Sequence, residues 1–394
     1  MHFVLILALW IVALPAAAAC LYLLGLTLLS AAQPAPARSS RRLRFDIIVP
    51  AHNEEAVLAN VIRSLQALDW PADRFRVVVV ADNCTDKTAA IAGAAGAHVM
   101  QRIDPDHRGK GYALDFGFKS SRARRWADAV VVIDADAEVS PNLLESYACR
   151  IERGEHAVQA HYGVSNTGAS WRTRLLSIAK AAFHIVRSRA RERLSLSCGI
   201  RGNGWAVTHT LLDQVPYKAF SLTEDLEYGI DLGMAGFRVA YADEAHANAE
   251  MVSGGADARK QRQRWESGRF QLIRAMTGSL LRQAFRKRSL VCLDLACDLM
   301  VLPLSYVVLN VVALLVLAAI AMRAEPAIGG WMWVGVGCAA ALVLHILRGW
   351  QLSGAGLRGL ADLARAPFFL LWKVLVMLRG GSSKDWIRTK REGS

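Results

Sequence analysis

Apolar residues along this chain follow patterns that predict different kinds of element. Between residues 45 and 140, short runs of β-branched residues alternate with segments in which apolar residues recur every three or four positions. This alternation is typical of parallel strands joined by helices, in a sheet that is buried on both faces. We therefore predict a doubly wound α/β unit with strands near 44–51, 74–82, 98–103 and 129–134.

The pattern becomes mixed between residues 141 and 270. Strands are expected near 156–164 and 237–243, and a long helix over 170–194. No internal repeat interrupts this region. We treat residues 45–270 as one domain.

Uncharged apolar runs occupy both ends of the chain. Residues 3–30 carry no charged side chain, and 300–322 and 331–347 are similar runs joined by a short loop. Each can cross a hydrocarbon core roughly 30 Å thick as a helix. The run 366–378 is shorter and contains Lys373, so an interfacial helix is expected there.

The basic cluster that follows the first apolar run sets the expected orientation. Residues 1–31 form the predicted transmembrane helix, 32–44 a basic linker, and 271–394 a C-terminal membrane region. The positive-inside rule places the intervening domain in the cytoplasm, on a multi-pass protein of the inner membrane. A cleaved secretory signal is the alternative, but a basic segment before the apolar run is missing and the run is long for a signal.

Composition narrows the classes of partner. The net charge is +13, but much of the basic excess flanks apolar segments and is expected to face anionic lipid headgroups rather than nucleic acid. Arg269 is expected to face lipid or solvent. Asp294 and Asp298 are expected at headgroup level on an amphipathic helix, with a transport path as the alternative. The seven cysteines form no CxxC pair, which argues against a disulfide or zinc framework.

Acidic residues follow the predicted strands of the sheet. Asp82 ends the second strand, and Asp134 and Asp136 follow the fourth. Because ligands of open α/β sheets bind at the carboxyl ends of the strands, we expect these side chains to converge. Clustered carboxylates suit Mg²⁺ or Mn²⁺, which can share a diphosphate. The alternative for Asp134 is a simple turn cap.

Three motifs follow Asp134 and Asp136 later in the chain. "SCGIRGNGWAV" at 197–207 is rich in glycine, "SLTEDLEYGI" at 221–230 opens a helix with two acids, and "RKQRQRW" covers 259–265. On a helix, positions 261, 264 and 265 share one face.

Taken together, these residues resemble family 2 glycosyltransferases, especially membrane-embedded members related to cellulose, chitin and hyaluronan synthases and bacterial exopolysaccharide enzymes. The resemblance covers roughly residues 45–270. It rests on motifs that occur in the family's order: "VPAHNEE", "ADNCTDKT", "GKGYAL", "DAD", "GNGWA", "TED" and "QRQRW". The closing "DWIRTKRE" at 385–392 is a weaker signal.

The resemblance implies a Rossmann-like, GT-A type domain inserted between N-terminal and C-terminal transmembrane helices. It implies inverting transfer of a sugar from a nucleotide diphosphate sugar, a UDP-sugar by family expectation, with Mg²⁺ or Mn²⁺. The acceptor would be a hydroxyl of a lipid-linked or growing glycan, and the reaction would belong to exopolysaccharide or glycolipid biosynthesis. The other expected partners are membrane lipids and export or assembly proteins.

Carried over residue by residue, the motifs assign the donor site. Pro50, Ala51 and Glu54 would line the nucleoside pocket, with a helix-dipole acid as the alternative for Glu54. Asp82 would orient the nucleobase. Lys110 would pair with a phosphate, although a solvated surface lysine is the competing interpretation.

The remaining roles concern the reaction itself. Asp134 would lie near the ribose or the metal, and Asp136 would ligate the metal. Asp225 would be the general base that takes the proton of the acceptor hydroxyl, with Glu224 as the competing candidate on the acceptor side.

The last motif, "QRQRW", is assigned to binding the acceptor and to closing the site over the diphosphate. Arg264 would clamp the diphosphate with its planar fork, while Gln261 and Trp265 would bind the acceptor.

Other functions stay open at this point. A processive synthase that also secretes its product is one alternative, but few spans are predicted. Paired carboxylates also serve glycosidases, and a degenerate enzyme domain would leave a non-catalytic membrane scaffold. The nucleotide-type sheet disfavours the glycosidase, and the intact acids disfavour the scaffold.

Overall fold

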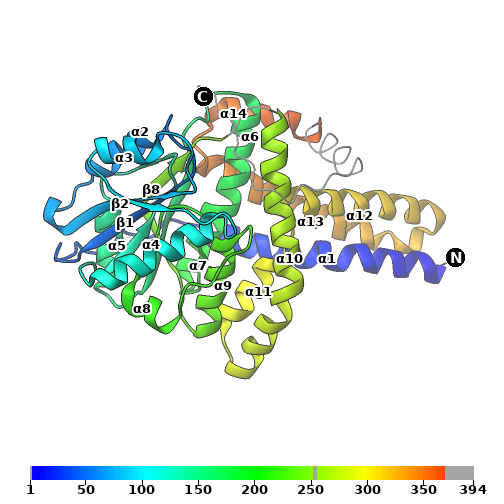
Figure 1. Cartoon of the computed structure of the whole chain (residues 1–394). Coiled ribbons are helices and arrows are strands. Elements are labelled where there is room, and N and C mark those ends of the chain that lie inside the picture. Colours follow the sequence, from blue (N-terminus) through cyan, green and yellow to red (C-terminus); the bar gives the residue numbers. More distant parts are fainter. Residues whose placement is uncertain (1, 252–254, 369–394) are drawn as a thin grey trace.

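The computed structural model describes residues 2–251 and 255–368, with side chains described except at 255–265. Figure 1 shows an α/β body built on one sheet and an elongated bundle of helices that projects from it. The tail at 385–392 and most of the expected interfacial helix at 366–378 lie outside the described residues.

The first half of the sheet is parallel, as the pattern predicts. It contains β1 (Phe45–Ala51), β2 (Phe75–Asp82), β3 (His98–Arg102) and β4 (Ala129–Val132), in the order β3-β2-β1-β4. The side chains of β1 are buried on both faces except at Pro50. Near-continuous β-branched residues therefore occur in β1 and β4 because neither face of the sheet meets water.

The second half continues the sheet with a mixture of directions. β7 (Trp205–Thr208) pairs antiparallel with β4 and is followed by β6 (Ala157–Val164), β8 (Ala240–Ala249) and β5 (Ala137–Val139), which gives eight strands. The patterns predict β6 and β8, although β8 begins later than expected. They miss β5 and β7, because strands of three and four residues are too short to show a period.

Helices cover both faces of the sheet. α2 (Leu58–Gln66), α3 (Thr88–Ala94) and α5 (Leu143–Ile151) pack on one face, around Ile62 and Tyr147. α4 (Lys110–Arg124), α8 (His209–Gln214) and α9 (Glu224–Ala235) pack on the other. The result is the three-layer arrangement expected of a doubly wound unit.

One helix differs from its prediction in an informative way. The helix expected over 170–194 consists of α6 (Trp171–Lys180), a π-helical segment η2 (Ala181–Val186) and α7 (Arg187–Arg193). Ser170 caps α6 by accepting the backbone N–H of Thr173. π-helical segments are rare and frequently occur at functional sites.

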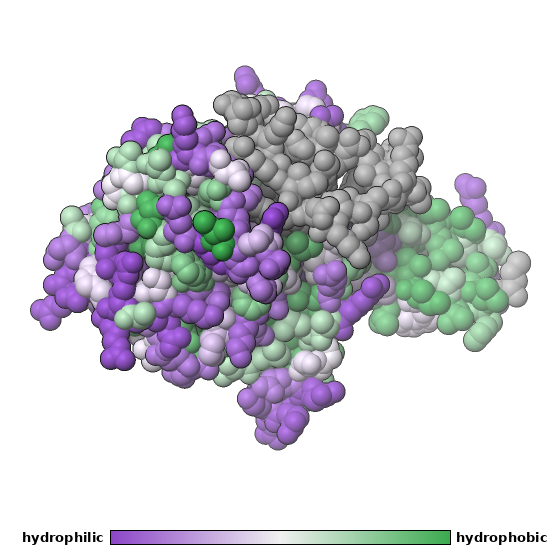
Figure 2. Space-filling model, in the orientation of Figure 1, coloured by the Kyte–Doolittle hydropathy of each residue, from purple (hydrophilic) through white to green (hydrophobic). Residues whose placement is uncertain are grey.

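The projecting bundle contains the apolar segments from the two ends of the chain. α1 (His2–Leu28), α12 (Leu304–Ala324) and α13 (Gly330–Leu352) form it, and they lie close to the predicted spans. With the 3₁₀ turn η3 (Pro326–Ile328) before α13, the described residues contain three helical segments long and apolar enough to cross a membrane. Figure 2 shows a mainly hydrophobic surface over the bundle and a mainly hydrophilic one over the sheet.

The remaining helices connect the two parts. α10 (Gly255–Lys287) runs between the body and the bundle (Figure 1), followed by α11 (Leu290–Met300), and α14 (Gly356–Asp362) packs against α6. Short 3₁₀ turns occur at η1 (Ala72–Arg74) and η4 (Leu363–Arg365).

The region between the body and the bundle differs from the sequence predictions in two places. Arg269 is buried rather than facing lipid or solvent, because its guanidinium donates to backbone carbonyls at the end of α11. Asp294 and Asp298 are also buried, at 8% and 3% exposure. They lie inside the protein rather than at its surface because arginines of α7 form ion pairs with both.

Candidate active site

The carboxyl ends of three parallel strands bring the predicted donor residues to one edge. Ala51 of β1 lies opposite Ala81 of β2, so Asp82 comes directly after this pair. Asp82 is 5% exposed, and its carboxylate accepts a hydrogen bond from Arg102 Nη1 at 2.6 Å. The sequence analysis missed Arg102, which ends β3, because nothing in its own neighbourhood marks it as a partner of Asp82.

The side of this edge that is predicted to bind the nucleoside is built by the end of β1 and the segment after it. Pro50 and Ala51 end the strand, and the backbone N–H of Glu54 donates to Thr88 Oγ1 at 2.8 Å. Cys84 Sγ lies 3.4 Å from the carbonyl oxygen of Ala51. These contacts bring the ends of β1 and β2 together, so that Pro50, Ala51 and Glu54 lie on the side of the site that carries Asp82.

Asp134 and Asp136 lie on the turn between β4 and β5. The side-chain oxygen of Asn203 accepts the backbone N–H of Asp134 at 2.9 Å, which ties this turn to the glycine-rich stretch at 197–207. Lys180 of α6 faces both carboxylates. Burial lowers the pKa of Lys180 to about 7, and the negative charges of Asp136 and Asp134 oppose that shift.

Lys110 connects the two halves of the site. Its ammonium lies 2.6 Å from Asp134 Oδ1 and 3.5 Å from Glu224 Oε1, and it donates to the carbonyl of Gly202 at 2.6 Å. The solvated-lysine interpretation is therefore wrong. The next residue must be small, because a Cβ at Gly111 would lie 2.4 Å from the carbonyl oxygen of Ala219.

The two acids of the "TED" motif begin α9, as predicted. Burial raises the pKa of Glu224 to about 7, against the attraction of Lys110. Burial also raises the pKa of Asp225. Gly202, at a φ of +92°, passes so close that a Cβ there would lie 3.3 Å from Asp225 Oδ2. A carboxyl with a raised pKa in a confined place suits proton transfer near neutral pH.

An aromatic side chain lies beside the candidate base. The same Cβ at Gly202 would lie 3.9 Å from the Tyr162 ring, and Lys180 Nζ lies 3.2 Å from that ring's centroid. Tyr162 and Lys180 therefore join the group that surrounds Asp225. Sequence reasoning missed both, because β6 and α6 meet here only through the fold.

The remaining predicted residues lie on α10. The helix backbone includes Gln261, Arg264 and Trp265, but their side chains are outside the described part of the structure.

The acid pair can be tested as a metal site from its donor set. Within residues 2–251 and 266–368, no three side chains of the types that ligate metals gather into a cage. Asp134 and Asp136 supply two carboxylates from one turn. Mg²⁺ is typically held by one or two carboxylates together with substrate phosphates, so the pair fits a cation that a diphosphate shares.

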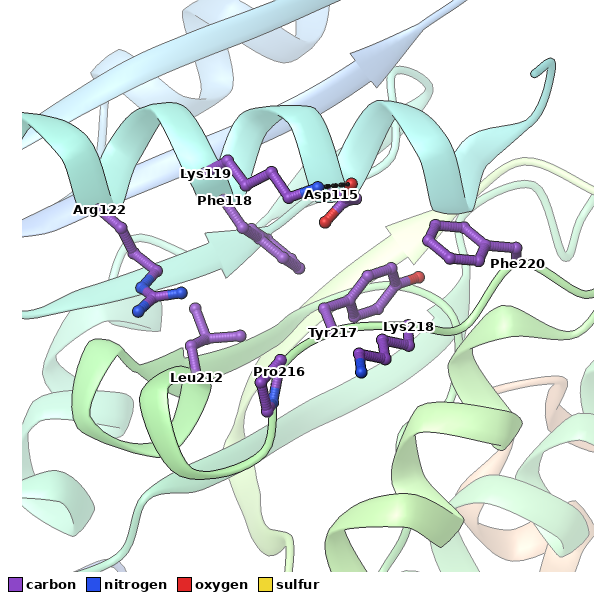
Figure 3. Close-up of a pocket in the computed structure, with 9 residues that line it drawn as sticks. All are labelled: Asp115, Phe118, Lys119, Arg122, Leu212, Pro216, Tyr217, Lys218 and Phe220. Atoms are coloured by element: carbon purple, nitrogen blue, oxygen red, sulfur yellow. Dashed lines mark hydrogen bonds and ion pairs between the residues drawn. The ribbon is translucent and has the colours of Figure 1, made fainter. Parts of the chain in front are cut away.

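A separate pocket of about 370 Å³ lies between α4 and residues 212–220 (Figure 3). Figure 3 shows Phe118 and Tyr217 on its walls, with Lys119, Arg122 and Lys218 around them. None of the predicted site residues lines it. The strand-end group, and not this pocket, is therefore the candidate active site.

Comparison with known proteins identifies the family of the chain. Residues 43–268 match the model of the family described as "Glycosyltransferase like family 2". The beta-monoglucosyldiacylglycerol synthase of Synechocystis is 30% identical over 237 residues, which are 57% of this chain and 47% of that protein. Glucomannan 4-beta-mannosyltransferase 7 of Arabidopsis thaliana is 23% identical over 247 residues, 59% of this chain and 44% of that protein. The chain thus spans about half the length of these curated relatives.

A solved structure with a similar fold is the mannosyltransferase PcManGT from Pyrobaculum calidifontis, in complex with GDP-Man and Mn²⁺. It has a TM-score of 0.55 and 18% identity, and the match covers 85% of this chain and 97% of that one. Because the family model covers more than half of the 394 residues, the chain belongs to glycosyltransferase family 2, with a GT-A fold between apolar helices.

Proposed function

We propose that this protein transfers a sugar, with inversion, from a nucleotide diphosphate sugar to a hydroxyl of a lipid-linked or glycan acceptor. The reaction would take place at the cytoplasmic face of the inner membrane. The observation that carries the proposal is the arrangement around Lys110, which joins the Asp134 carboxylate to the acids that begin α9. A donor bound at the strand ends would thus lie beside a candidate base.

The donor half of the site is proposed to bind the nucleotide. Pro50, Ala51 and Glu54 would contact the nucleoside, and the buried Asp82, fixed by Arg102, would orient the base. Asp134 and Asp136 would hold Mg²⁺ or Mn²⁺. When bound, the cation would neutralise charge on the departing diphosphate.

The acceptor half is proposed to act on the hydroxyl. Asp225 would accept the proton as the hydroxyl attacks, and Glu224 would share the charge of Lys110 with it. Tyr162 offers an aromatic ring beside Asp225 against which an acceptor sugar or headgroup can pack. Gln261 and Trp265 of α10 would complete the acceptor side, and Arg264 would clamp the diphosphate.

The full chain, purified in detergent and supplied with a panel of nucleotide sugars, Mn²⁺ or Mg²⁺ and a membrane lipid extract, tests the proposal. We expect transfer from one nucleotide sugar, with a product that extracts with lipid or glycan. Products that carry a single added sugar would exclude the processive alternative, and long products would support it. Sugar release from a polymer without any nucleotide sugar would overturn the transferase assignment.

Replacing Lys110 should expose its role as the central cation. In Lys110→Met, three nearby carboxylates lose their shared countercharge, so we expect the melting temperature to fall by roughly 3–8 °C. The pKa of Lys110 is raised in the folded state, so Lys110 is protonated at both pH 6 and pH 8, and the pH dependence comes from its partner Glu224. The loss should shrink at pH 6, where Glu224 is largely protonated.

Thermal unfolding of the two proteins at both pH values measures this effect. Lys119→Met is the matched control, because Lys119 lies on the same helix and pairs with Asp115 at the surface. An equal loss at pH 6 and pH 8 would show that Lys110 does not compensate Glu224.

Glu224→Gln should move the acidic limb of the pH profile. In the wild type, Glu224 and Asp225 titrate as a pair whose pKa values are raised, so kcat/KM should increase up to about pH 7. Glu224→Gln removes the group with the pKa of about 7, so the limb should move to lower pH by about one unit, where Asp225 alone titrates.

The pH dependence of kcat/KM in the two proteins measures this shift. Asp231→Asn is the control, because burial raises the pKa of Asp231 to about 6 on the same helix. If the limb moves in Asp231→Asn and stays in Glu224→Gln, the profile belongs to Asp231 and the pair is not the titrating group.

A further inference from the structure

A buried cluster of charged residues lies between the α/β body and the apolar bundle, outside the proposed catalytic groups. We call it the arginine cluster, and it contains Arg187, Arg191, Arg201, Arg269, Asp294 and Asp298. All six side chains are at least nine-tenths buried. They come from α7, the loop before β7, α10 and α11, which are far apart in the sequence and meet near the centre of Figure 1.

The charges of the cluster do not balance. Four guanidinium groups face two carboxylates, so four positive minus two negative charges leave an excess of two. Asp298 receives most of the pairing, with Arg187 at 2.9 Å, Arg191 at 2.7 Å and Arg201 at 3.6 Å. Burial, together with the neighbouring guanidiniums, lowers the pKa of Arg269 to about 10 despite the attraction of Asp298. Buried charge without a counterion is costly, so the cluster is suited to an added anion.

The arginines of the cluster also have unused hydrogen-bond donors. Each of the four arginines has a buried N–H group without a partner among the described residues: Arg187 Nε, Arg191 Nη1, Arg201 Nε and Arg269 Nε. Three of these guanidiniums surround the same Phe183 ring, at 4.6, 4.8 and 5.4 Å from its centroid. Phe183 is only half-buried, so the packing around the cluster reaches the surface at this ring.

The position of the cluster relates it to the membrane. Arg191 donates to the hydroxyl of Tyr22, which in turn donates to Asp294 at 2.8 Å. Tyr22 lies about 9 Å along the axis from the end of α1, which is one of the three helices able to cross a membrane. The cluster therefore lies beside the end of a candidate membrane span. Basic pockets beside transmembrane helices bind the headgroups of anionic lipids.

We propose that the arginine cluster binds the phosphate group of an anionic membrane lipid. The planar guanidinium of arginine can donate two parallel hydrogen bonds to the oxygens of a phosphate. Several guanidiniums around one phosphate would use the unpaired N–H groups and neutralise the excess positive charge. The site goes beyond the proposed transfer reaction. Because Arg201 directly precedes Gly202, which packs beside Asp225, a lipid held there would lie next to the candidate acceptor site.

Binding of defined lipids to the full chain in maltoside micelles tests this proposal without any transfer reaction. Dioleoylphosphatidic acid should bind, as seen by native mass spectrometry, and should raise the melting temperature. Dioleoylglycerol has the same acyl chains without the phosphate and should do neither. Inorganic phosphate should give a much smaller effect. If dioleoylglycerol binds and stabilises the protein as much as dioleoylphosphatidic acid does, the proposal is wrong. If inorganic phosphate does so, the cluster binds a free anion rather than a lipid.

Variants separate a binding site from a structural ion-pair network. Arg201→Gln removes the guanidinium with the longest ion-pair distance in the cluster, 3.6 Å to Asp298. We expect the affinity for phosphatidic acid to fall about tenfold or more while the lipid-free protein keeps its melting temperature. Arg201→Lys should retain part of the affinity, and Arg269→Gln is the second variant. Arg189→Gln, on α7 but paired with Asp243, is the control and should bind like the wild type. A cluster that only holds the helices together would instead lower the melting temperature equally with and without lipid.

Discussion

Replacing Asp225 by Asn is expected to lower kcat for sugar transfer by about 10²- to 10⁴-fold while leaving donor affinity nearly unchanged. The amide keeps the size of the carboxylate but cannot accept the proton of the acceptor hydroxyl. The environment of Asp225 supports this separation, because it lies at the start of α9 and is not the carboxylate that pairs most closely with Lys110. Steady-state transfer and calorimetric titration of the nucleotide diphosphate measure the two effects.

Asp231→Asn provides the matched control for this substitution. Asp231 lies on the same helix, is partly buried and also has a raised pKa, so a general effect of removing an acid from α9 would appear there too. If Asp225→Asn loses nucleotide binding while its fold and melting temperature are intact, Asp225 belongs to the donor site. If Glu224→Gln alone abolishes transfer at all pH values, Glu224 is the base.

Sequence patterns predict the parallel half of the fold well, and the reason is physical. β1, β2 and β4 are buried on both faces, so their apolar runs are long enough to recognise, and the helices between them carry a clear period. β7 escapes prediction although it lies in the middle of the sheet. It has only four residues, and its place between β4 and β6 depends on pairing across distant segments.

The sequence predicts those residues of the candidate site that belong to a recognisable local motif. The acids after β4 and at the start of α9 stand out locally, and the structure brings Asp134 and Glu224 to the same lysine. Arg102, Tyr162 and Lys180 do not stand out, because each has an ordinary local sequence and gains its role from a neighbour far along the chain. Motifs identify the groups that do chemistry, whereas the groups that tune them emerge from packing.

The correction at α11 has the same origin. Asp294 and Asp298 are four residues apart next to an apolar run, which favours a headgroup position when the helix is considered alone. The structure supplies arginines from α7 instead, and a buried carboxylate is stable when such partners neutralise it. Burial alone would raise the pKa of Asp298, but Arg191, Arg201 and Arg187 outweigh it and hold that pKa well below its usual range.

Asp136→Asn is expected to weaken metal-dependent binding of the nucleotide diphosphate by about 100-fold or more, and transfer should fall with it. Asp136 lies on the turn after β4 with Asp134, and Lys180 approaches both carboxylates from α6. Asp134 lies 2.6 Å from Lys110, so its substitution would disturb that ion pair as well, and Asp136 is the residue that the family motif assigns to the metal. Titration of the nucleotide diphosphate with and without Mn²⁺ measures the metal-dependent part of the affinity.

Glu138→Gln is the matched control for that titration, because Glu138 lies two residues further on and is exposed to solvent. It removes one negative charge from the same segment, so a long-range electrostatic effect would appear in both variants, whereas loss of a metal ligand would appear only in Asp136→Asn. If the wild type binds the nucleotide equally well in EDTA, the carboxylates do not act through a cation. In that case Lys110 and Lys180, the two ammonium groups that flank the turn, would be left to neutralise the diphosphate.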